Sequence, residues 1–240
     1  HTLLRWLCTP HHQDSALFPA ITQLERAAGF QREDSAAQRL DKLEALLATA
    51  SDDPRGAAPL LADLLSVPAD GRYPASDLTP QKRKEKTQQA LLAMVEGLAA
   101  RRPLLMLCED VHWIDPTTRE VLDLLVDRVP ALRILLVVTF RPEFKAPWIG
   151  LPQVTLLSLS RLPPRRRVEM IGHLTRGKML PADIVDQISS RTDGVPLFIE
   201  ELTKAVVESD LLVESGGQYV ATAATAPQAI PASLQESLLA

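Results

Sequence analysis

A short apolar run that leads directly into two adjacent carboxylates constrains the fold of this chain more than any other feature. Residues 104–108 read Leu-Leu-Met-Leu-Cys, and Glu109 and Asp110 follow them. A run this short that is apolar at every position is typical of a buried strand in a parallel sheet. Acids that follow such a strand lie at the carboxyl edge, where open α/β sheets bind their ligands. Two interpretations fit: the acids hold Mg²⁺ beside nucleotide phosphates, or they only begin a loop or cap a helix.

Length and charge restrict the class of protein. The chain has 240 residues, 46% of them hydrophobic, which is enough for a full core and a smaller second domain. A formal net charge of −4 argues against general attraction to nucleic acid or to an anionic membrane. Cys8 and Cys108 form no disulfide framework, which favours a reducing compartment such as the cytoplasm. We find no membrane span or signal peptide, and we expect the chain to be a fragment of a longer protein.

The pattern of apolar residues predicts a first domain of the α/β class, over residues 1–162. Strands are predicted at 2–8, 104–108, 134–140 and 154–159. Helices are predicted at 15–29, at 57–66 and at 116–129. Two more are predicted from their caps: one follows the capping box at 35–38, and the other begins at Thr79-Pro80 and extends to about residue 98. Strands that are separated by helices favour parallel pairing with right-handed crossovers.

The second predicted domain, residues 163–240, is mainly helical. Helices are expected at 168–174, 181–190 and 196–209. The turn residues 215–218 lie between two short apolar segments and favour a small hairpin. Residues 222–231 are rich in Ala, Thr and Pro and are predicted to form a loop, and the chain stops at Ala240 within a helical pattern.

Several motifs, taken in order, resemble the STAND NTPases, which are signal-transduction ATPases within the AAA-like P-loop class. The resemblance is closest to the ATPase regions beside bacterial class III adenylate/guanylate cyclase domains and in large LuxR-type transcriptional regulators. It covers almost the whole chain, and an ordered set of motifs is more specific than one alone. The stretches that carry it are 8–19, 40–46, 109–115 (Glu-Asp-Val-His-Trp-Ile-Asp), 137–144, 191–204 and 230–237.

The resemblance implies roles for three residues of the first domain. Glu109 matches the Walker B acid that faces Mg²⁺ or its water shell, and Asp110 matches the acid that orients or deprotonates the attacking water. Glu109 and Asp110 could exchange these two roles, because the sequence does not show which of the two side chains faces the nucleotide. Arg141, after the next strand, matches the sensor-1 position, where a guanidinium reads the γ-phosphate. Without the surrounding motif, Arg141 would be interpreted as a strand-end arginine in water.

In the second domain, the resemblance assigns a nucleotide contact to one turn. Gly194-Val195-Pro196 resembles the GxP turn of the helical domain, whose proline packs near the adenine. The alternative is a plain helix start, with a glycine in the turn and a proline at the first helical position.

One departure from the family pattern limits what this chain can bind. P-loop NTPases hold phosphates with Gly-x-x-x-x-Gly-Lys-Ser/Thr, and this motif is absent from the sequence. In the family the phosphate loop and the first strand precede the strand predicted at 2–8. In the family's sheet order, 5-1-4-3-2, the missing first strand leaves a gap between the sensor strand and the last strand. We therefore expect these residues alone to bind ATP very weakly.

The function implied by the resemblance is a regulatory ATPase module of a larger bacterial signalling protein, with ATP and Mg²⁺ as ligands. Hydrolysis would switch a cyclase or DNA-binding effector domain outside these residues, and nucleotide-dependent self-association is compatible with this function. Contact with a membrane, or direct nucleic-acid binding by this segment, is not expected. Two alternatives stay open: a module that holds nucleotide without turnover, and an interaction scaffold that has lost nucleotide.

Other residue clusters favour structural interpretations. A zinc site is conceivable from five cysteine and histidine residues, but their spacing matches no finger pattern, and cysteines at strand ends are usually small buried residues. The basic runs 82–86 and 165–167 are more typical of solvated helix faces than of nucleic-acid patches. Trp113 is expected to pack as a core residue. The five zinc candidates are Cys8, His11, His12, Cys108 and His112.

Overall fold

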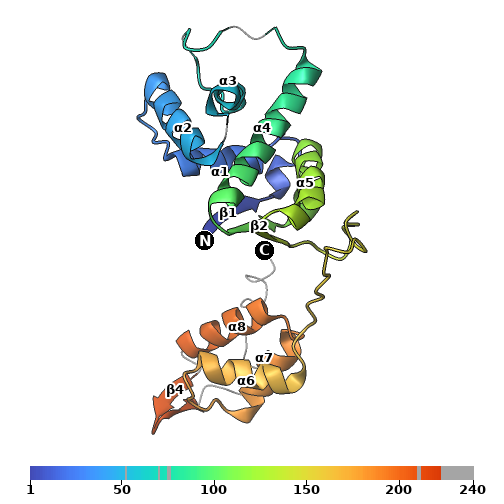
Figure 1. Ribbon diagram of the computed structural model, residues 1–240. Helices are drawn as coiled ribbons and strands as arrows, with labels where there is room; N and C mark the ends of the chain where they lie inside the picture. Colours follow the sequence, from blue (N-terminus) through green and yellow to red (C-terminus); the bar gives the residue numbers. More distant parts are fainter. Residues whose placement is uncertain (52, 70, 75–76, 210–211, 223–240) are drawn as a thin grey trace. The chain divides into compact units, whose positions relative to one another are not determined.

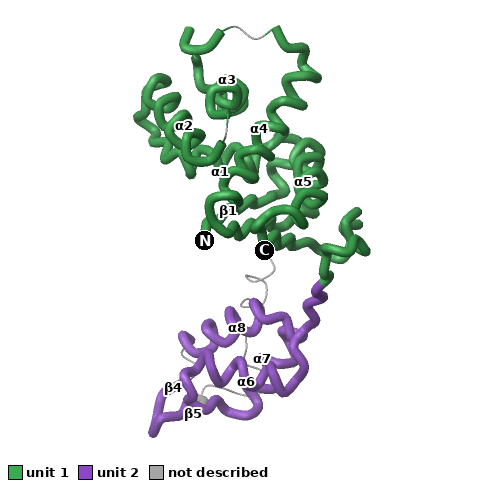
Figure 2. The backbone as a smooth tube through the Cα atoms, in the orientation of Figure 1, with its two compact units in different colours: residues 1–156 green, residues 157–240 purple. Residues whose placement is uncertain are grey.

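The chain folds into two compact units, residues 1–156 and 157–240 (Figure 2). This computed structural model describes residues 1–222 except 52, 70, 75–76 and 210–211. The first unit is of the mixed α/β class, with a three-stranded parallel sheet flanked by helices. The boundary between the units lies before residue 157, whereas the sequence analysis places it after residue 162. Each unit is described by itself.

The sheet of the first unit consists of β1 (Thr2–Leu7), β2 (Leu104–Glu109) and β3 (Ile134–Val138) in the order β1-β2-β3. Both pairs are parallel, and the register places Leu4 beside Met106 and Met106 beside Leu136. The predictions for the first two strands are confirmed almost to the residue. The third strand begins as predicted and ends two positions before Phe140.

Capping residues explain where the helices of the first unit begin. Ser35 and Gln38 form the predicted capping box, and Thr79 caps the helix that opens with Pro80. Asp53 accepts a hydrogen bond from the Gly56 amide, so the third helix begins three residues before the predicted start. The helices are α1 (Phe18–Ala28), α2 (Ala36–Ala50), α3 (Pro54–Leu64), α4 (Pro80–Arg101) and α5 (Pro116–Arg128), with 3-10 turns η1 (Pro10–His12), η2 (Val111–Trp113) and η3 (Val129–Ala131).

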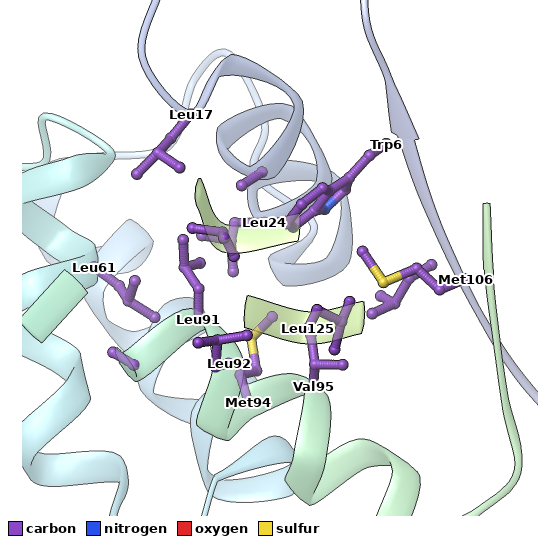
Figure 3. Close-up of a cluster of buried hydrophobic side chains, with 14 of the residues drawn as sticks. Trp6, Leu17, Leu24, Leu61, Leu91, Leu92, Met94, Val95, Met106 and Leu125 are labelled. Carbon is purple, nitrogen blue, oxygen red and sulfur yellow. The ribbon is translucent and has the colours of Figure 1, made fainter. Parts of the chain in front are cut away.

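One face of the sheet and the helices share a single apolar core. Trp6 and Met106 point from β1 and β2 toward leucines of α1, α4 and α5 (Figure 3). Burying one such side chain contributes roughly 1.5–3 kcal/mol to stability. Trp113 is partly buried and packs against this core, as the sequence predicts. Leucines that pack around Trp6 and Met106 include Leu24, Leu91, Leu92 and Leu125.

The opposite face of the sheet is mostly apolar and partly exposed, and it also carries the charged pair Arg5 and Glu109. Leu3, Leu105 and Leu135 lie side by side in one row, and Leu135 is 64% exposed. The next row pairs Leu107 with Val137. Parallel sheets are normally covered on both faces, so this face is unusual for its class. We call it the open sheet face; its apolar residues are Leu3, Leu7, Leu105, Leu107, Leu135 and Val137.

The fourth predicted strand, at 154–159, is not a strand. The segment forms no strand pairing, and Leu157 and Leu159 are 80% and 96% exposed. A strand is held by ladder hydrogen bonds to a neighbour, and within the described residues no strand pairs with this segment.

In the part of the second unit that the structure describes, three helices and a hairpin pack around a small apolar core. The predicted hairpin is confirmed, and Gly216 and Gly217 both adopt positive φ in its turn. The predicted loop at 222–231 lies outside the described residues beyond position 222. The elements are α6 (Pro164–Leu174), α7 (Ala182–Arg191), α8 (Pro196–Glu208), β4 (Leu212–Ser215) and β5 (Gln218–Ala221). The core contains Ile171, Ile184, Ile188, Ile199, Leu202, Val206 and Leu212.

A helix that crosses a membrane must be both long and apolar. Within the described parts of the two units (Figure 1), none of the helices meets both conditions.

Candidate functional site

The candidate site lies where β2 and β3 end. These strands are parallel neighbours, so their carboxyl ends share one edge of the sheet. Glu109 is the last residue of β2, and Asp110 follows it. The Asp110 amide donates a hydrogen bond of 3.0 Å to Oγ1 of Thr139, the residue after β3. The Val111 amide donates to the Thr139 carbonyl at 3.0 Å, and the Thr139 amide donates to the Cys108 carbonyl at 2.9 Å. The two strand ends are therefore joined directly.

Asp110 has a left-handed backbone conformation, with φ 56° and ψ 41°. Aspartate adopts this region more readily than most residues, but the conformation still costs free energy relative to glycine. Its side chain is exposed, and within the described residues it has no hydrogen bond or ion pair. Residues held in sparsely populated conformations cluster at functional sites, and here the held residue presents a free carboxylate.

Glu109, in contrast, has a cationic partner. Its carboxylate forms an ion pair with the Arg5 guanidinium of β1. The hydrogen bond to Glu109 raises the pKa of the Arg5 guanidinium. Arg5 is not among the site residues predicted from the sequence; a charged residue within the apolar run 3–7 is a usable signal for Arg5 itself, but it does not reveal the pair with Glu109. The structure thus distinguishes the two acids: Glu109 is neutralised by Arg5, whereas Asp110 is free.

Arg141 lies three residues after β3, at the same edge of the sheet. Its carbonyl accepts a hydrogen bond of 3.0 Å from the Phe144 amide, which closes a turn. The Phe144 ring packs beside Trp148, whose indole donates to Asp123 of α5 at 2.7 Å. These contacts anchor the chain after Arg141 to α5. The Arg141 side chain is exposed and has no ion pair within the described residues, so it is free to bind an anion.

Asp115, the last acid of the 109–115 motif, has a structural role. It is 2% exposed and caps α5, since Oδ1 accepts hydrogen bonds from the amides of Thr117 and Thr118 at 3.0 and 2.9 Å. The same oxygen accepts from the Leu17 amide at 3.2 Å, and Oδ2 accepts from the Thr118 hydroxyl. Leu17 is buried and has a φ of 59°. Asp115 therefore ties the start of α1 to the start of α5.

Replacing Asp115 with alanine should destabilise the first unit by about 2–4 kcal/mol, because a helix cap is lost and the Leu17 amide is left buried without a partner. Asp115→Asn should cost less, since Oδ1 is kept and Thr118 can accept from the new amide. The measurement is urea unfolding followed by tryptophan fluorescence, because Trp6, Trp113 and Trp148 all lie in this unit. Equal losses for the two variants would contradict the assignment.

Asp110→Gly should leave the stability of the first unit unchanged or raise it by about 0.5–1 kcal/mol, because glycine adopts positive φ without strain. The same urea measurement checks this. A loss of more than about 1 kcal/mol would show that the Asp110 carboxylate is needed for folding rather than retained for binding.

Gly194 belongs to a tightly packed turn of the second unit. Its carbonyl accepts from the Leu162 amide at 2.8 Å, and with φ 76° a Cβ would lie 2.5 Å from the Leu162 carbonyl oxygen. Arg167 donates to the carbonyls of Leu162 and Ser189 at 2.7 and 2.9 Å. The solvated-face interpretation of run 165–167 is therefore wrong for Arg167, which is partly buried to satisfy these carbonyls.

Pro196 is the exposed first residue of α8. The structure joins Glu109, Asp110 and Arg141 at one sheet edge. It describes Gly194 and Pro196 only within the second unit, where the turn has a clear packing role.

Gly194→Ala should destabilise the second unit by more than Gly177→Ala does. Both glycines have φ near 80°, but a Cβ at Gly177 meets no atom within 4 Å. The control should therefore cost only the strain, about 1 kcal/mol, and Gly194→Ala about 1–3 kcal/mol more. Urea unfolding monitored by far-UV circular dichroism checks the difference, with tryptophan fluorescence reporting the first unit. Equal costs would show that the close approach at Gly194 is unimportant.

The alternative zinc site finds no support. Burial raises the pKa of the Cys8 thiol to about 12 and also raises the pKa of Cys108, as expected of cysteines that pack as small buried residues. Within the described residues, no group of three or more His, Cys, Asp and Glu side chains could hold a metal ion.

The basic run 82–86 is partly neutralised. Arg83 pairs with Asp63, and Lys84 pairs with Glu120. These pairs agree with a solvated helix face on α4.

Comparison with known proteins gives a relative of unknown activity. The chain is 30% identical over 212 residues to an uncharacterized protein of Rhizobium meliloti (strain 1021). The match covers 86% of this chain and 20% of the relative, so the chain spans about a fifth of that protein's length. No protein-family model matches the chain. No solved structure matches it either.

Proposed function

We propose that this chain is the larger part of a P-loop nucleotide-binding module, which binds ATP with Mg²⁺ and acts as a regulatory switch within a longer bacterial protein. The observation that carries the proposal is the placement of a free carboxylate, Asp110, and a free guanidinium, Arg141, at the ends of adjacent parallel strands of an unfinished sheet. The open edge and the open face of this sheet support the P-loop assignment.

Strand order and handedness indicate what completes the sheet. The connections from β1 to β2 and from β2 to β3 step across the sheet in one direction, and the helices that they contain pack on one face (Figure 1). Crossovers are right-handed, so a connection that steps back to β1 from a strand beyond β3 places its helix on the other face. A βα unit before β1 would thus cover the open sheet face. Its strand would lie where the family's order 5-1-4-3-2 has the phosphate-loop strand.

The outer edge of β3 supports the same arrangement. The strand reads Ile-Leu-Leu-Val-Val, and among the described residues no strand pairs with its outer side. Proteins normally protect edge strands with charges, prolines or bulges, because an apolar edge promotes aggregation. A further strand would remove this edge. The helix after it would begin at the carboxyl edge, where its amides and dipole favour phosphate.

The residues present fit a magnesium-bound triphosphate at this edge. Mg²⁺, held through water by Glu109 or Asp110, would neutralise phosphate charge. The free Asp110 carboxylate is suited to orient or deprotonate a water molecule. The Arg141 guanidinium is suited to stabilise charge on the γ-phosphate. In the family that the sequence resembles, the turn that matches Gly194-Val195-Pro196 contacts the adenine, and bound nucleotide holds a conformation that its loss releases. The effector is a cyclase or DNA-binding domain outside these residues.

One observation favours a second candidate. The pair between Glu109 and Arg5 neutralises one of the two carboxylates. A module that holds nucleotide without turnover needs only one of these acids. This alternative differs from the first in hydrolysis and not in binding.

The 240-residue chain should not bind Mg²⁺–ATP measurably below millimolar concentrations, because no phosphate loop is present. A longer protein that includes the preceding βα unit should bind it in the micromolar range. Isothermal titration calorimetry of both proteins makes the comparison. Micromolar binding by the 240-residue chain would refute the proposed position of the phosphate site.

Single-turnover hydrolysis by the longer protein separates the candidates. Asp110→Asn should slow the chemical step about 100-fold or more, with ATP affinity little changed, because it removes a base and keeps the shape of the side chain. The matched control is Asp127→Asn, on the exposed side of α5. Binding without turnover in the unmodified protein would select the second candidate, and absence of binding would select the scaffold.

A further inference from the structure

Thr139 joins the ends of β2 and β3 by hydrogen bonds that have no part in the roles proposed for Glu109, Asp110 and Arg141. Its backbone amide and carbonyl bond to Cys108 and Val111, on either side of the acid pair. Its hydroxyl oxygen accepts the Asp110 amide proton at 3.0 Å. Thr139 therefore forms backbone hydrogen bonds on both sides of the acid pair and a side-chain hydrogen bond to Asp110 itself.

This side-chain hydrogen bond controls the conformation of Asp110. A left-handed aspartate is higher in energy than the helical or extended alternatives, so surrounding contacts must hold it there. Rotation of Asp110 out of this region would turn its amide away from Thr139 Oγ1. The same rotation would redirect the Cα–Cβ bond and move the carboxylate.

Thr139 also links the position of the Asp110 carboxylate to that of the Arg141 guanidinium. Arg141 lies two residues after Thr139, so the residue that holds Asp110 also belongs to the segment that carries the guanidinium. A change in how Thr139 meets Asp110 therefore changes the relative placement of the two charged groups. Displacements of about 1 Å between reacting groups can cost about 100-fold in rate.

We propose that Thr139 is a positioning residue, whose hydroxyl holds Asp110 in the left-handed conformation and thereby aims its carboxylate at the water that attacks the nucleotide. The catalytic part of this inference rests on the proposed function. The structural part concerns Asp110 alone and is tested without nucleotide. Thr139→Ser keeps the acceptor oxygen, whereas Thr139→Val keeps the shape and removes it.

The first test uses the 240-residue chain and measures hydrogen exchange of the Asp110 amide by NMR. In Thr139→Val this amide should exchange at least about 10-fold faster, while amides of the β-strand cores keep their rates. Thr139→Ser should exchange like the unmodified chain. The control is Thr2→Val, the same change at the start of β1. An unchanged Asp110 rate in Thr139→Val overturns the proposal, and so does loss of protection throughout the sheet in both Thr139 variants.

The second test uses the longer protein and measures ATP hydrolysis. Thr139→Val should lower kcat about 10- to 100-fold, the usual effect of removing a group that orients another, with KM for ATP unchanged and activity restored in Thr139→Ser. In an Asp110→Asn background the same change should have little further effect, because the two residues act as a unit. Additive losses would overturn the positioning role. If the unmodified longer protein does not hydrolyse ATP, the proposed function fails, and the exchange measurement still decides whether Thr139 holds Asp110.

Discussion

The parallel pairing of β2 with β3 is the interaction on which the candidate site depends. Because the two strands run the same way, Asp110 and the chain around Arg141 leave the sheet at one edge, although thirty residues separate them. Thr139 strengthens this relation by bonding to the residues on both sides of the strand end. The core leucines of α1, α4 and α5 stabilise the sheet from one side only, which leaves the other side for a further element.

The open sheet face and the outer edge of β3 also connect the fold with the proposed function. An apolar face and an apolar edge are costly in water, and one preceding βα unit would cover both. The crossover rule places the start of that unit's helix at the edge that carries Asp110 and Arg141. Ligands of open α/β sheets bind where successive connections leave on opposite faces, and under the proposed arrangement this edge would be such a place. Stability and nucleotide binding would then depend on the same proposed segment.

Most of the fold could be predicted from the sequence because its signals are local. The apolar run before Glu109, the Ser35 capping box and the Thr79-Pro80 helix start each depend on a few neighbouring residues. The segment 154–159 was mispredicted because a strand needs a partner, and partners are not encoded locally.

The site was predicted less completely because its details depend on contacts between distant residues. The pair between Arg5 and Glu109 joins positions that are far apart in sequence, and composition gives no sign of it. Arg167 was misinterpreted because a basic run looks solvated until the carbonyls that one member satisfies are known. The restraint of Asp110 by Thr139 requires knowledge of both strand ends. The acids themselves could be found, because they follow a strand directly.

The most direct test of the central claim is hydrogen exchange of β3, measured by mass spectrometry in the 240-residue chain and in the longer protein with Mg²⁺–ATP. If a strand from before β1 completes the sheet, residues 134–138 should exchange much more slowly in the longer protein, and nucleotide should further protect 109–113 and 139–141. Equal exchange of β3 in both proteins, with no effect of nucleotide at either strand end, would contradict the account.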